Sequence, residues 1–131
     1  MTYLQLCQPL AIETRDLGGP PKSLTDGSQR TAKLAAAIKE SWLQIQLLRN
    51  DWEWLLGDAP TALQSLENDE DEPFIDSAYH MAIVWYAVVS EGYRQAATEL
   101  ISIGEREWNK YYGILTRRYV APLQFVGGGD W

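Results

Sequence analysis

Residues 45–55 read Ile-Gln-Leu-Leu-Arg-Asn-Asp-Trp-Glu-Trp-Leu and place two tryptophans, Trp52 and Trp54, at the end of a long helical pattern. Apolar side chains recur there every three or four positions, at Leu34, Ile38, Trp42, Ile45, Leu48, Trp52 and Leu55. This spacing puts them along one stripe of a single helix, which we expect to be the central helix of the fold. Leu43, Leu47 and Trp54 lie off the stripe, so a second flank of the helix should also be covered.

The tryptophans have two interpretations, which the sequence leaves open. Trp is largely buried on average, which favours ordinary core packing. A second apolar flank instead suits a contact with a neighbouring subunit, because obligate interfaces resemble a core cut in half. The residues expected to serve core or subunit packing are Trp42, Trp52, Trp54 and Trp85. Of these, Trp42 and Trp54 are the expected contributors to a subunit contact.

The boundaries of the first two helices follow from Pro, Gly and capping residues. A short helix is expected over residues 3–14, followed by a loop rich in Gly and Pro over residues 17–29. Asp26 or Ser28 would cap the second helix. That helix should continue to Gly57, a length of about 28 residues or roughly 42 Å.

Two further helices are predicted in the second half of the chain. Pro73 is expected to open the third, with Asp76 in its first turn and Gly92 as its end. The fourth should run over residues 93–119, where Gly104 and Gly113 would each cost about 1 kcal/mol relative to Ala. A close helix contact or a bend would offset that cost.

An acidic block separates the second and third predicted helices. It contains five carboxylates in six residues: Glu67, Asp69, Glu70, Asp71 and Glu72. Like charges at this density repel one another, so the block is expected to be a solvated loop. It lacks the spaced ligands and central Gly of a calcium loop, and no metal is predicted there.

The chain ends in a segment that cannot continue a helix, residues 121–131. Its apolar residues are Pro122, Leu123, Phe125 and Val126, and three glycines then precede Asp130 and Trp131. We interpret it as an extended tail that carries a large apolar anchor, since such a segment can order on a partner. The alternative is a frayed terminus.

Composition excludes several classes of function. With 131 residues, 46% hydrophobic, the chain can form one domain with a real core. A formal charge of -7 and eleven scattered Lys and Arg argue against binding to nucleic acid through its phosphates. Cys7 is alone and is expected to be a small buried hydrophobe in a reducing cytoplasm. The apolar run 82–89 is far shorter than the roughly 18 residues of a membrane span.

Catalytic and cofactor motifs are not found in the sequence. There is no phosphate-binding Gly loop and no paired metal-ligand spacing, and His80 is the single histidine. A lone His on an aromatic helix is expected to serve packing or capping, since sites need several convergent groups. We therefore predict no enzyme, no cofactor and no metal, although carboxylates such as Glu13, Asp16 or Glu91 could converge in three dimensions.

The predicted fold is all-α: a small bundle of about four helices, two of them long, with an acidic loop and an extended C-terminal tail. Residues 1–120 would form the helical domain and residues 121–131 the tail.

Several short motifs of this chain, and their order along it, resemble those of one known family. These motifs are Tyr3-Leu-Gln-Leu-Cys-Gln, Gly18-Gly-Pro, Trp42-Leu-Gln-Ile-Gln, Asp51-Trp-Glu-Trp-Leu, and Pro73 followed by His80-Met-Ala-Ile-Val-Trp-Tyr-Ala. Together they are similar to the head-to-tail adaptor, or connector, proteins of long-tailed bacteriophages, up to about Tyr119. Longer members of that group carry a strand-rich insertion between the Asp-Trp-Glu-Trp helix and the Pro-to-His helix. This chain has only the acidic loop there.

The resemblance implies a structural virion protein of the neck region, assembled in the host cytoplasm. It would form a ring, expected to be a dodecamer, that joins the portal protein to a downstream neck or tail-terminator protein. Duplex DNA would pass through without specific binding, and the acidic block is the candidate for facing the channel. The tail residues Pro122 to Trp131 would then bind the portal.

Other classes remain open at the level of sequence. A small acidic helical regulator or inhibitor of one host protein would form a discrete heterodimer and no ring. The same motifs are also compatible with a neck protein that lies next to the adaptor.

Overall fold

The computed structural model describes residues 1–14, 18–49, 52, 63–117, 126–127 and 129–130. In these residues the elements are α1 (Tyr3–Glu13), α2 (Gln29–Gln46), the short 3₁₀ helix η1 (Ser77–Tyr79), α4 (Met81–Gln95) and α5 (Thr98–Leu115). Two-residue strands β1 (Val126–Gly127) and β2 (Gly129–Asp130) pair in parallel. The prediction of a small all-α bundle is confirmed, with α2 and α5 as its two long helices of 18 residues each.

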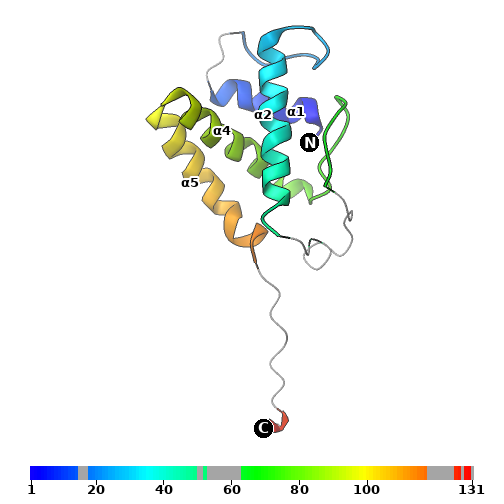
Figure 1. The fold of residues 1–131 in the computed structure, drawn as a ribbon, viewed down its shortest axis with the longest axis vertical. Coiled ribbons are helices and arrows are strands. Elements are labelled where there is room, and N and C mark those ends of the chain that lie inside the picture. The colour runs from blue at the N-terminus through cyan, green and yellow to red at the C-terminus, as the bar shows by residue number, and fades with distance from the viewer. Residues whose placement is uncertain (15–17, 50–51, 53–62, 118–125, 128, 131) are drawn as a thin grey trace.

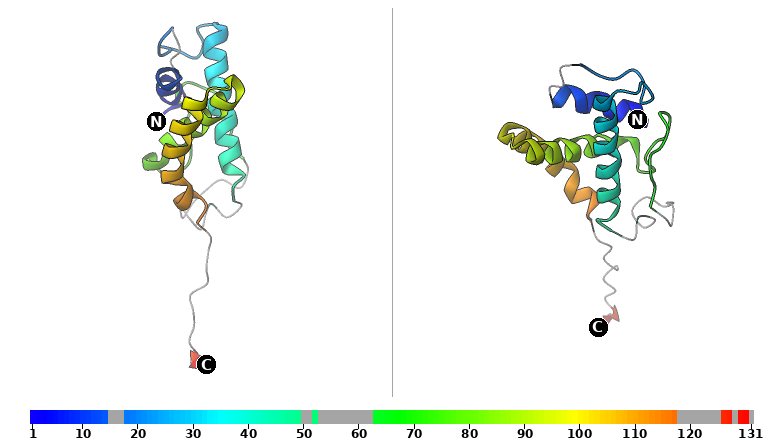
Figure 2. Two further views of the ribbon diagram at one scale, coloured as in Figure 1. Left: turned by 90° about the vertical axis from the view of Figure 1, so that its left-hand side faces the viewer. Right: turned by 45° about the horizontal axis from the view of Figure 1, so that its top comes forward.

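The central helix is α4, rather than α2 as the sequence suggested. Figure 1 shows α1, α2 and α5 placed around it, and all three pack against it. Its buried side chains are small or branched, including Ile83, Val84 and Val88. The two views in Figure 2 show that α4 and α5 form a hairpin that extends from the α1–α2 side of the molecule.

The starts of α1 and α2 follow from local capping signals. Gln5 N–H donates to Thr2 Oγ1 at 3.2 Å, and Thr2 N–H donates back to the Gln5 side chain at 2.9 Å, which is a capping box. Ser28 caps α2 by accepting from Thr31 N–H at 3.0 Å. Asp26 supports that cap, since its carboxylate accepts from Ser28 N–H at 2.9 Å.

The predicted length of the second helix is wrong, because α2 ends at Gln46. After the last turn the hydrogen bonds change to the 3₁₀ pattern, since Leu48 N–H donates at 3.0 Å to Ile45 O, three residues back instead of four. Trp52 folds back, and its indole N–H donates to Gln46 O at 2.9 Å. That carbonyl would accept from residue 50 in a continuing helix, so the indole competes with continuation. Residues 50–51 and 53–57 of the predicted helix lie outside the described residues.

The third helix starts later and ends later than the sequence predicted. Pro73 is buried outside any helix, Asp76 caps η1 by accepting from Ala78 N–H at 2.9 Å, and α4 begins only at Met81. Gly92 lies inside α4, which continues to Gln95. The chain reverses at Ala96, whose φ of 54° is left-handed, and α5 begins at Thr98.

Two glycines allow α4 and α5 to approach closely. A Cβ at Gly92 would lie 2.8 Å from Ile101 Cγ1, and a Cβ at Gly104 would lie 2.6 Å from Val89 Cγ2. The sequence suggested a close contact or a bend at Gly104, and the structure shows a close contact. Gly113 faces open space.

Candidate functional site

The side chain of Gln46, the last residue of α2, binds both backbone groups of Gln64 and so fixes this later part of the chain to the helix. Gln64 N–H donates to Gln46 Oε1 at 2.7 Å, and Gln46 Nε2 donates to Gln64 O at 2.8 Å. The Gln64 side chain accepts from Trp42 Nε1 at 2.9 Å and from Phe74 N–H at 3.0 Å. Gln46 is buried, and every such buried polar group needs a partner. This polar cluster therefore determines where the segment containing the acidic block lies.

An aromatic cluster surrounds these glutamines. The ring centroids of Trp42 and Phe74 are 5.0 Å apart, and those of Trp52 and Phe74 are 5.7 Å apart. Trp42 is fully buried and Trp52 nearly so, which leaves Trp42 no surface for a neighbouring subunit. The expectation that Trp42 contributes to a subunit contact is therefore wrong. Trp85 on α4 is partly buried against the core, and Trp54 lies outside the described residues.

The segment that carries the acidic block (residues 66–72, hereafter the acidic loop) caps the start of α1. Tyr3 N–H donates to Asp71 O at 2.7 Å, and Leu4 N–H donates to Asp69 O at 3.2 Å. These amides belong to the first turn of α1, where no intrahelical carbonyl is available. The side chain of Leu66 is fully buried, which fixes the start of the loop to the core. The loop is thus bound to α1 through its backbone, which leaves its side chains for other contacts.

Four of the five carboxylates of the acidic loop form hydrogen bonds or ion pairs, at Glu67, Asp69, Asp71 and Glu72, which corrects the expectation of a self-repelling, solvated segment. Asp71 accepts from the N–H groups of Glu67 and Asn68, both at 2.8 Å, and these bonds lower the pKa of its carboxyl. Hydrogen bonds from Ser65 and Lys39 lower the pKa of Glu67. The Lys39 Nζ to Glu67 Oε2 distance is 2.9 Å.

The outer side of the acidic loop nevertheless stays in solvent. Glu67, Glu70 and Glu72 are exposed, while Asp69 and Asp71 are half-buried. Asp69 accepts from Leu24 N–H and from Ser23 Oγ, both at 3.2 Å. The loop therefore presents negative charge from a fixed backbone.

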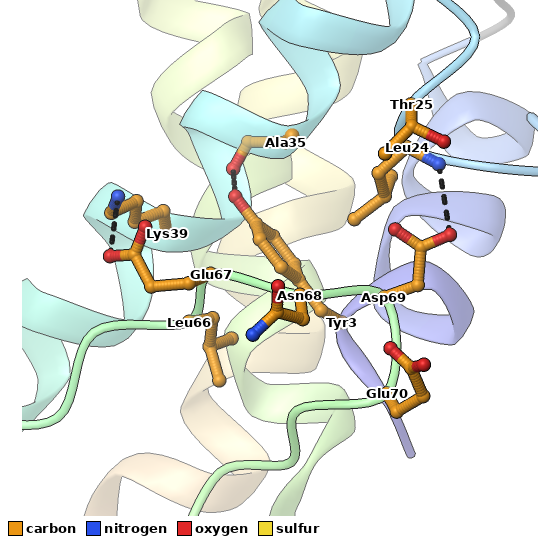
Figure 3. A pocket seen from close by; sticks show the side chains of 10 residues that line it. All are labelled: Tyr3, Leu24, Thr25, Ala35, Lys39, Leu66, Glu67, Asn68, Asp69 and Glu70. Atoms are coloured by element: carbon orange, nitrogen blue, oxygen red, sulfur yellow. Dashed lines mark hydrogen bonds and ion pairs between the residues drawn. The ribbon is translucent and has the colours of Figure 1, made fainter.

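A cavity of about 390 Å³ lies between the acidic loop and α2 (Figure 3). Tyr3 points into it, and its hydroxyl donates to Ala35 O at 2.6 Å. Burial first, and then the nearby Cys7 and Glu67, raise the pKa of the Tyr3 hydroxyl above its usual value. Tyr3 is therefore a neutral donor in this cavity and a structural tie between α1 and α2.

A second feature is the incompletely buried aromatic side of the α4–α5 hairpin. Tyr86 and Trp108 stack edge-to-face with centroids 5.2 Å apart, and Tyr112 continues the row at 6.0 Å from Trp108. Tyr93 is 64% exposed and Tyr112 is 47% exposed. We call Tyr86, Tyr93, Trp108 and Tyr112 the aromatic flank. A hollow of about 300 Å³ opens beside Tyr86, Tyr93 and Trp108, and Glu105 also lines it.

The apolar residues of α5 are mostly half-covered. Gly104 and Leu115 are its buried residues in the structure, and Ile114 is 37% exposed. Arg49 ties the end of the helix to the body by donating from Nη1 to Leu115 O at 3.3 Å. Leu47, the C-cap residue of α2, is 61% exposed. In the described part of the chain, the aromatic flank of the hairpin and Leu47 are therefore only partly covered.

The single histidine is buried at the start of α4, in agreement with a packing role. His80 Nε2 lies 2.8 Å from Ile75 O, and Nδ1 lies 2.6 Å from the amine of Met1. Burial is the main cause that lowers the pKa of His80, and the positive amine lowers it further. The neutral ring can donate to Ile75 and accept from Met1.

The described part of the chain contains no group of three or more His, Cys, Asp and Glu placed to hold a metal ion. None of its helices is long and apolar enough to cross a membrane. Four residues of the predicted tail anchor, Pro122, Leu123, Phe125 and Trp131, lie outside the described residues, and Val126 begins β1.

Sequence reasoning missed the Gln46–Gln64 pair and the aromatic flank as a unit. The flank had a usable signal, because Trp108 and Tyr112 are four positions apart on one helix. The glutamine pair had none, since its members are 18 positions apart and belong to no motif. Comparison with known protein families, with curated proteins and with solved structures found no match for this chain.

Proposed function

We propose that this chain is a structural subunit, the head-to-tail adaptor of a long-tailed bacteriophage. It would form a ring, expected to be a dodecamer, between the portal protein and a downstream neck or tail-terminator protein. The ring surrounds the path of the DNA, and no catalytic turnover is involved. Its place is the neck of the virion, after assembly in the host cytoplasm.

The observation that carries the proposal is the incomplete burial of α5. A helix of 18 residues with this many aromatic and branched side chains normally loses most of its apolar surface to the fold. Here α5 packs on α4 and leaves Tyr112 and Ile114 exposed. Such a surface is typical of a subunit that completes its packing against another chain. The adaptor family in particular is indicated by the short sequence motifs and their order along the chain.

Charge supports the same proposal. A formal charge of -7 on each subunit gives an assembled ring a strongly negative potential. Negative potential keeps duplex DNA from adhering while it passes. Under this proposal the exposed carboxylates of the acidic loop lie either on the channel wall or at a subunit boundary.

The test is co-sedimentation of the purified protein with DNA-filled, tailless capsids, followed by image averaging of the portal vertex. We expect a new symmetric ring at that vertex. Tyr112→Asp should reduce ring formation, because it puts a charge into the aromatic flank. Ser102→Asp adds the same charge to an exposed position of α5 away from that row, and should leave the ring intact. Absence of any binding by the wild-type chain would favour the small acidic regulator.

A further inference from the structure

The hollow of about 300 Å³ on the aromatic flank is formed by α4 and α5 alone. These two helices are the hairpin that extends from the α1–α2 side of the molecule in Figure 2. We call this hollow the aromatic hollow. Its volume is at the lower end of the range of about 300–1,000 Å³ that is usual for ligand sites, so it suits a single side chain. The lining residues are Tyr86, Val89, Ser90, Tyr93, Glu105 and Trp108.

The spacing of these residues explains why they meet. Tyr86, Val89 and Tyr93 follow one another at intervals of three and four positions, which places them on one face of α4. Glu105 and Trp108 are three positions apart and share a face of α5 in the same way. A Cβ at Gly104 would lie 2.6 Å from Val89 Cγ2, so the two faces approach closely beside the hollow. The hairpin therefore holds side chains of both helices around one small space.

Two rings of the aromatic hollow are fixed against each other. Tyr86 and Trp108 lie 5.2 Å apart between centroids with an interplanar angle of 82°, and both pack against the core. Tyr93 adds a third ring, which is 64% exposed. The face of an aromatic ring carries partial negative charge and attracts a cation within about 6 Å of its centroid. The hollow thus offers aromatic surface to a cation from both helices.

The only charged residue that lines the aromatic hollow is a carboxylate, Glu105. It is exposed, and among the described residues it forms no hydrogen bond or ion pair. The cations that flank it on α5 are paired elsewhere. Lys110 Nζ lies 3.0 Å from Glu107 Oε1, and Arg106 Nε lies 3.3 Å from Glu107 Oε2. Glu105 is therefore available to an incoming positive charge.

We propose that the aromatic hollow binds an arginine side chain presented by a partner protein with a basic surface. A guanidinium group is planar and weakly hydrated, so it stacks on aromatic rings at a small desolvation cost. Its fork of N–H donors also fits a carboxylate, here that of Glu105. Lysine matches this lining less well, because its ammonium group is compact and strongly hydrated. An anionic side chain would be repelled by Glu105.

Charge favours a different protein over a second copy of this chain as the source of the arginine. Each copy has a formal charge of -7, so two copies repel each other at long range, whereas a basic partner is attracted. A ring contact can overcome this repulsion through a large apolar interface, but a hollow for one side chain cannot. The inference goes beyond the proposed ring, which rests on the exposure of Tyr112 and Ile114. Neither of them lines the hollow.

The test is an NMR titration of the full chain with the peptide acetyl-Gly-Arg-Gly-amide, observed at the indole N–H of Trp108. A Trp108→Phe variant identifies that signal among those of the six tryptophans. We expect the signal to shift with added peptide. The citrulline peptide has nearly the same shape without the charge and should bind about tenfold more weakly. The lysine peptide should bind with intermediate affinity.

Variants then locate the bound arginine. Glu105→Gln and Tyr93→Ala should each weaken binding of the arginine peptide roughly threefold or more, and both positions are exposed, so the fold should be kept. Tyr93→Phe keeps the ring and should bind as the wild type does. Glu70→Gln removes an exposed carboxylate of the acidic loop, outside the hollow, and should also leave binding unchanged.

Four outcomes would overturn the inference. The first is no shift of the Trp108 signal, and the second is equal binding of the arginine and citrulline peptides, which would indicate apolar contact alone. The third is unchanged binding by both Glu105→Gln and Tyr93→Ala. The fourth is tighter binding of tetramethylammonium than of guanidinium, which would replace arginine with a methylated ammonium group. Self-association of the chain that Glu105→Gln weakens would reject a different protein in favour of a second copy.

Discussion

The side chain of Gln46 bonds to both backbone groups of Gln64: its Oε1 accepts from Gln64 N–H at 2.7 Å, and its Nε2 donates to Gln64 O at 2.8 Å. This pair joins the end of α2 to the segment that leads into the acidic loop. It provides partners for both backbone groups of Gln64 and for the buried side chain of Gln46, whose Nε2 also donates to Trp42 O at 3.3 Å. The position of the acidic loop relative to α2 therefore depends on two uncharged residues.

Replacing Gln46 with Leu should destabilise the protein by about 2–3 kcal/mol. The change keeps the volume close to that of Gln but leaves Gln64 N–H and C=O without their partner, and each unsatisfied buried group costs about 1–3 kcal/mol. Urea unfolding followed by circular dichroism measures the difference. Gln44→Leu is the matched control, because Gln44 is exposed on the same helix and should change stability by less than about 0.5 kcal/mol. Equal effects of the two variants would contradict this account.

Replacing either of two glycines of α5 with Ala should change the stability of the protein, in opposite directions at the two positions. Gly104→Ala is expected to destabilise by about 1–3 kcal/mol, because the new Cβ would lie 2.6 Å from Val89 Cγ2 and 3.0 Å from Val89 N. Gly113→Ala should stabilise by up to about 1 kcal/mol, since that position is open and Ala is the better helix former. Thermal unfolding of both variants measures the pair. A stabilising Gly104→Ala would show that α4 and α5 are not in close contact.

His80 should titrate below the usual histidine pKa of about 6.5 in the folded chain. The unfolded chain then binds more protons than the folded chain as the pH falls below that value, so stability decreases on acidification through this window. His80 is the single histidine, so one NMR titration of its ring proton measures the folded pKa directly. The groups that face it are the backbone of Ile75 and Pro73, the amine of Met1 and the carboxylate of Glu72. A folded pKa at or above 6.5 would contradict burial of a neutral ring.

Cys7 should be unreactive toward thiol reagents in the native protein. Its side chain is fully buried, and burial together with the charge of Asp69 raises the pKa of the thiol to about 12. The reactive thiolate is therefore scarce near pH 8. A colorimetric disulfide reagent should label the chain at once in denaturant and only slowly without it. Immediate labelling of the folded chain would show that α1 is not packed as described.

The features predicted correctly from sequence were those governed by neighbouring residues. The start of α2 follows from Ser28 and Asp26, which act within one turn, and α1 matches its predicted range almost to the residue. The end of α2 could not be predicted in this way. Its apolar spacing continues to Leu55, but the competing partners of Gln46 are Trp52 and Gln64, which only the folded chain brings there.

The role of Gly92 also could not be predicted from its neighbours in the sequence. A glycine after an apolar run is typical of a helix end, which made it the predicted end of the third helix. In the structure it lies inside α4, because Ile101 of α5 packs where a side chain would be. The acidic block was likewise identified as a loop, yet its attachment to α1 uses backbone carbonyls that no side-chain pattern reveals.

The attachment of the acidic loop to α1 makes these two segments one cooperative unit. The first amides of α1 end on carbonyls of the loop, so neither segment can open alone without exposing the other's hydrogen-bonding groups. In native-state hydrogen exchange, the amides of Tyr3 and Leu4 should exchange with the opening free energy of the loop rather than as a fraying helix end. A partner that binds the acidic loop and stabilises it would therefore slow the exchange of the Tyr3 and Leu4 amides. These amides would report binding although they do not belong to the binding surface.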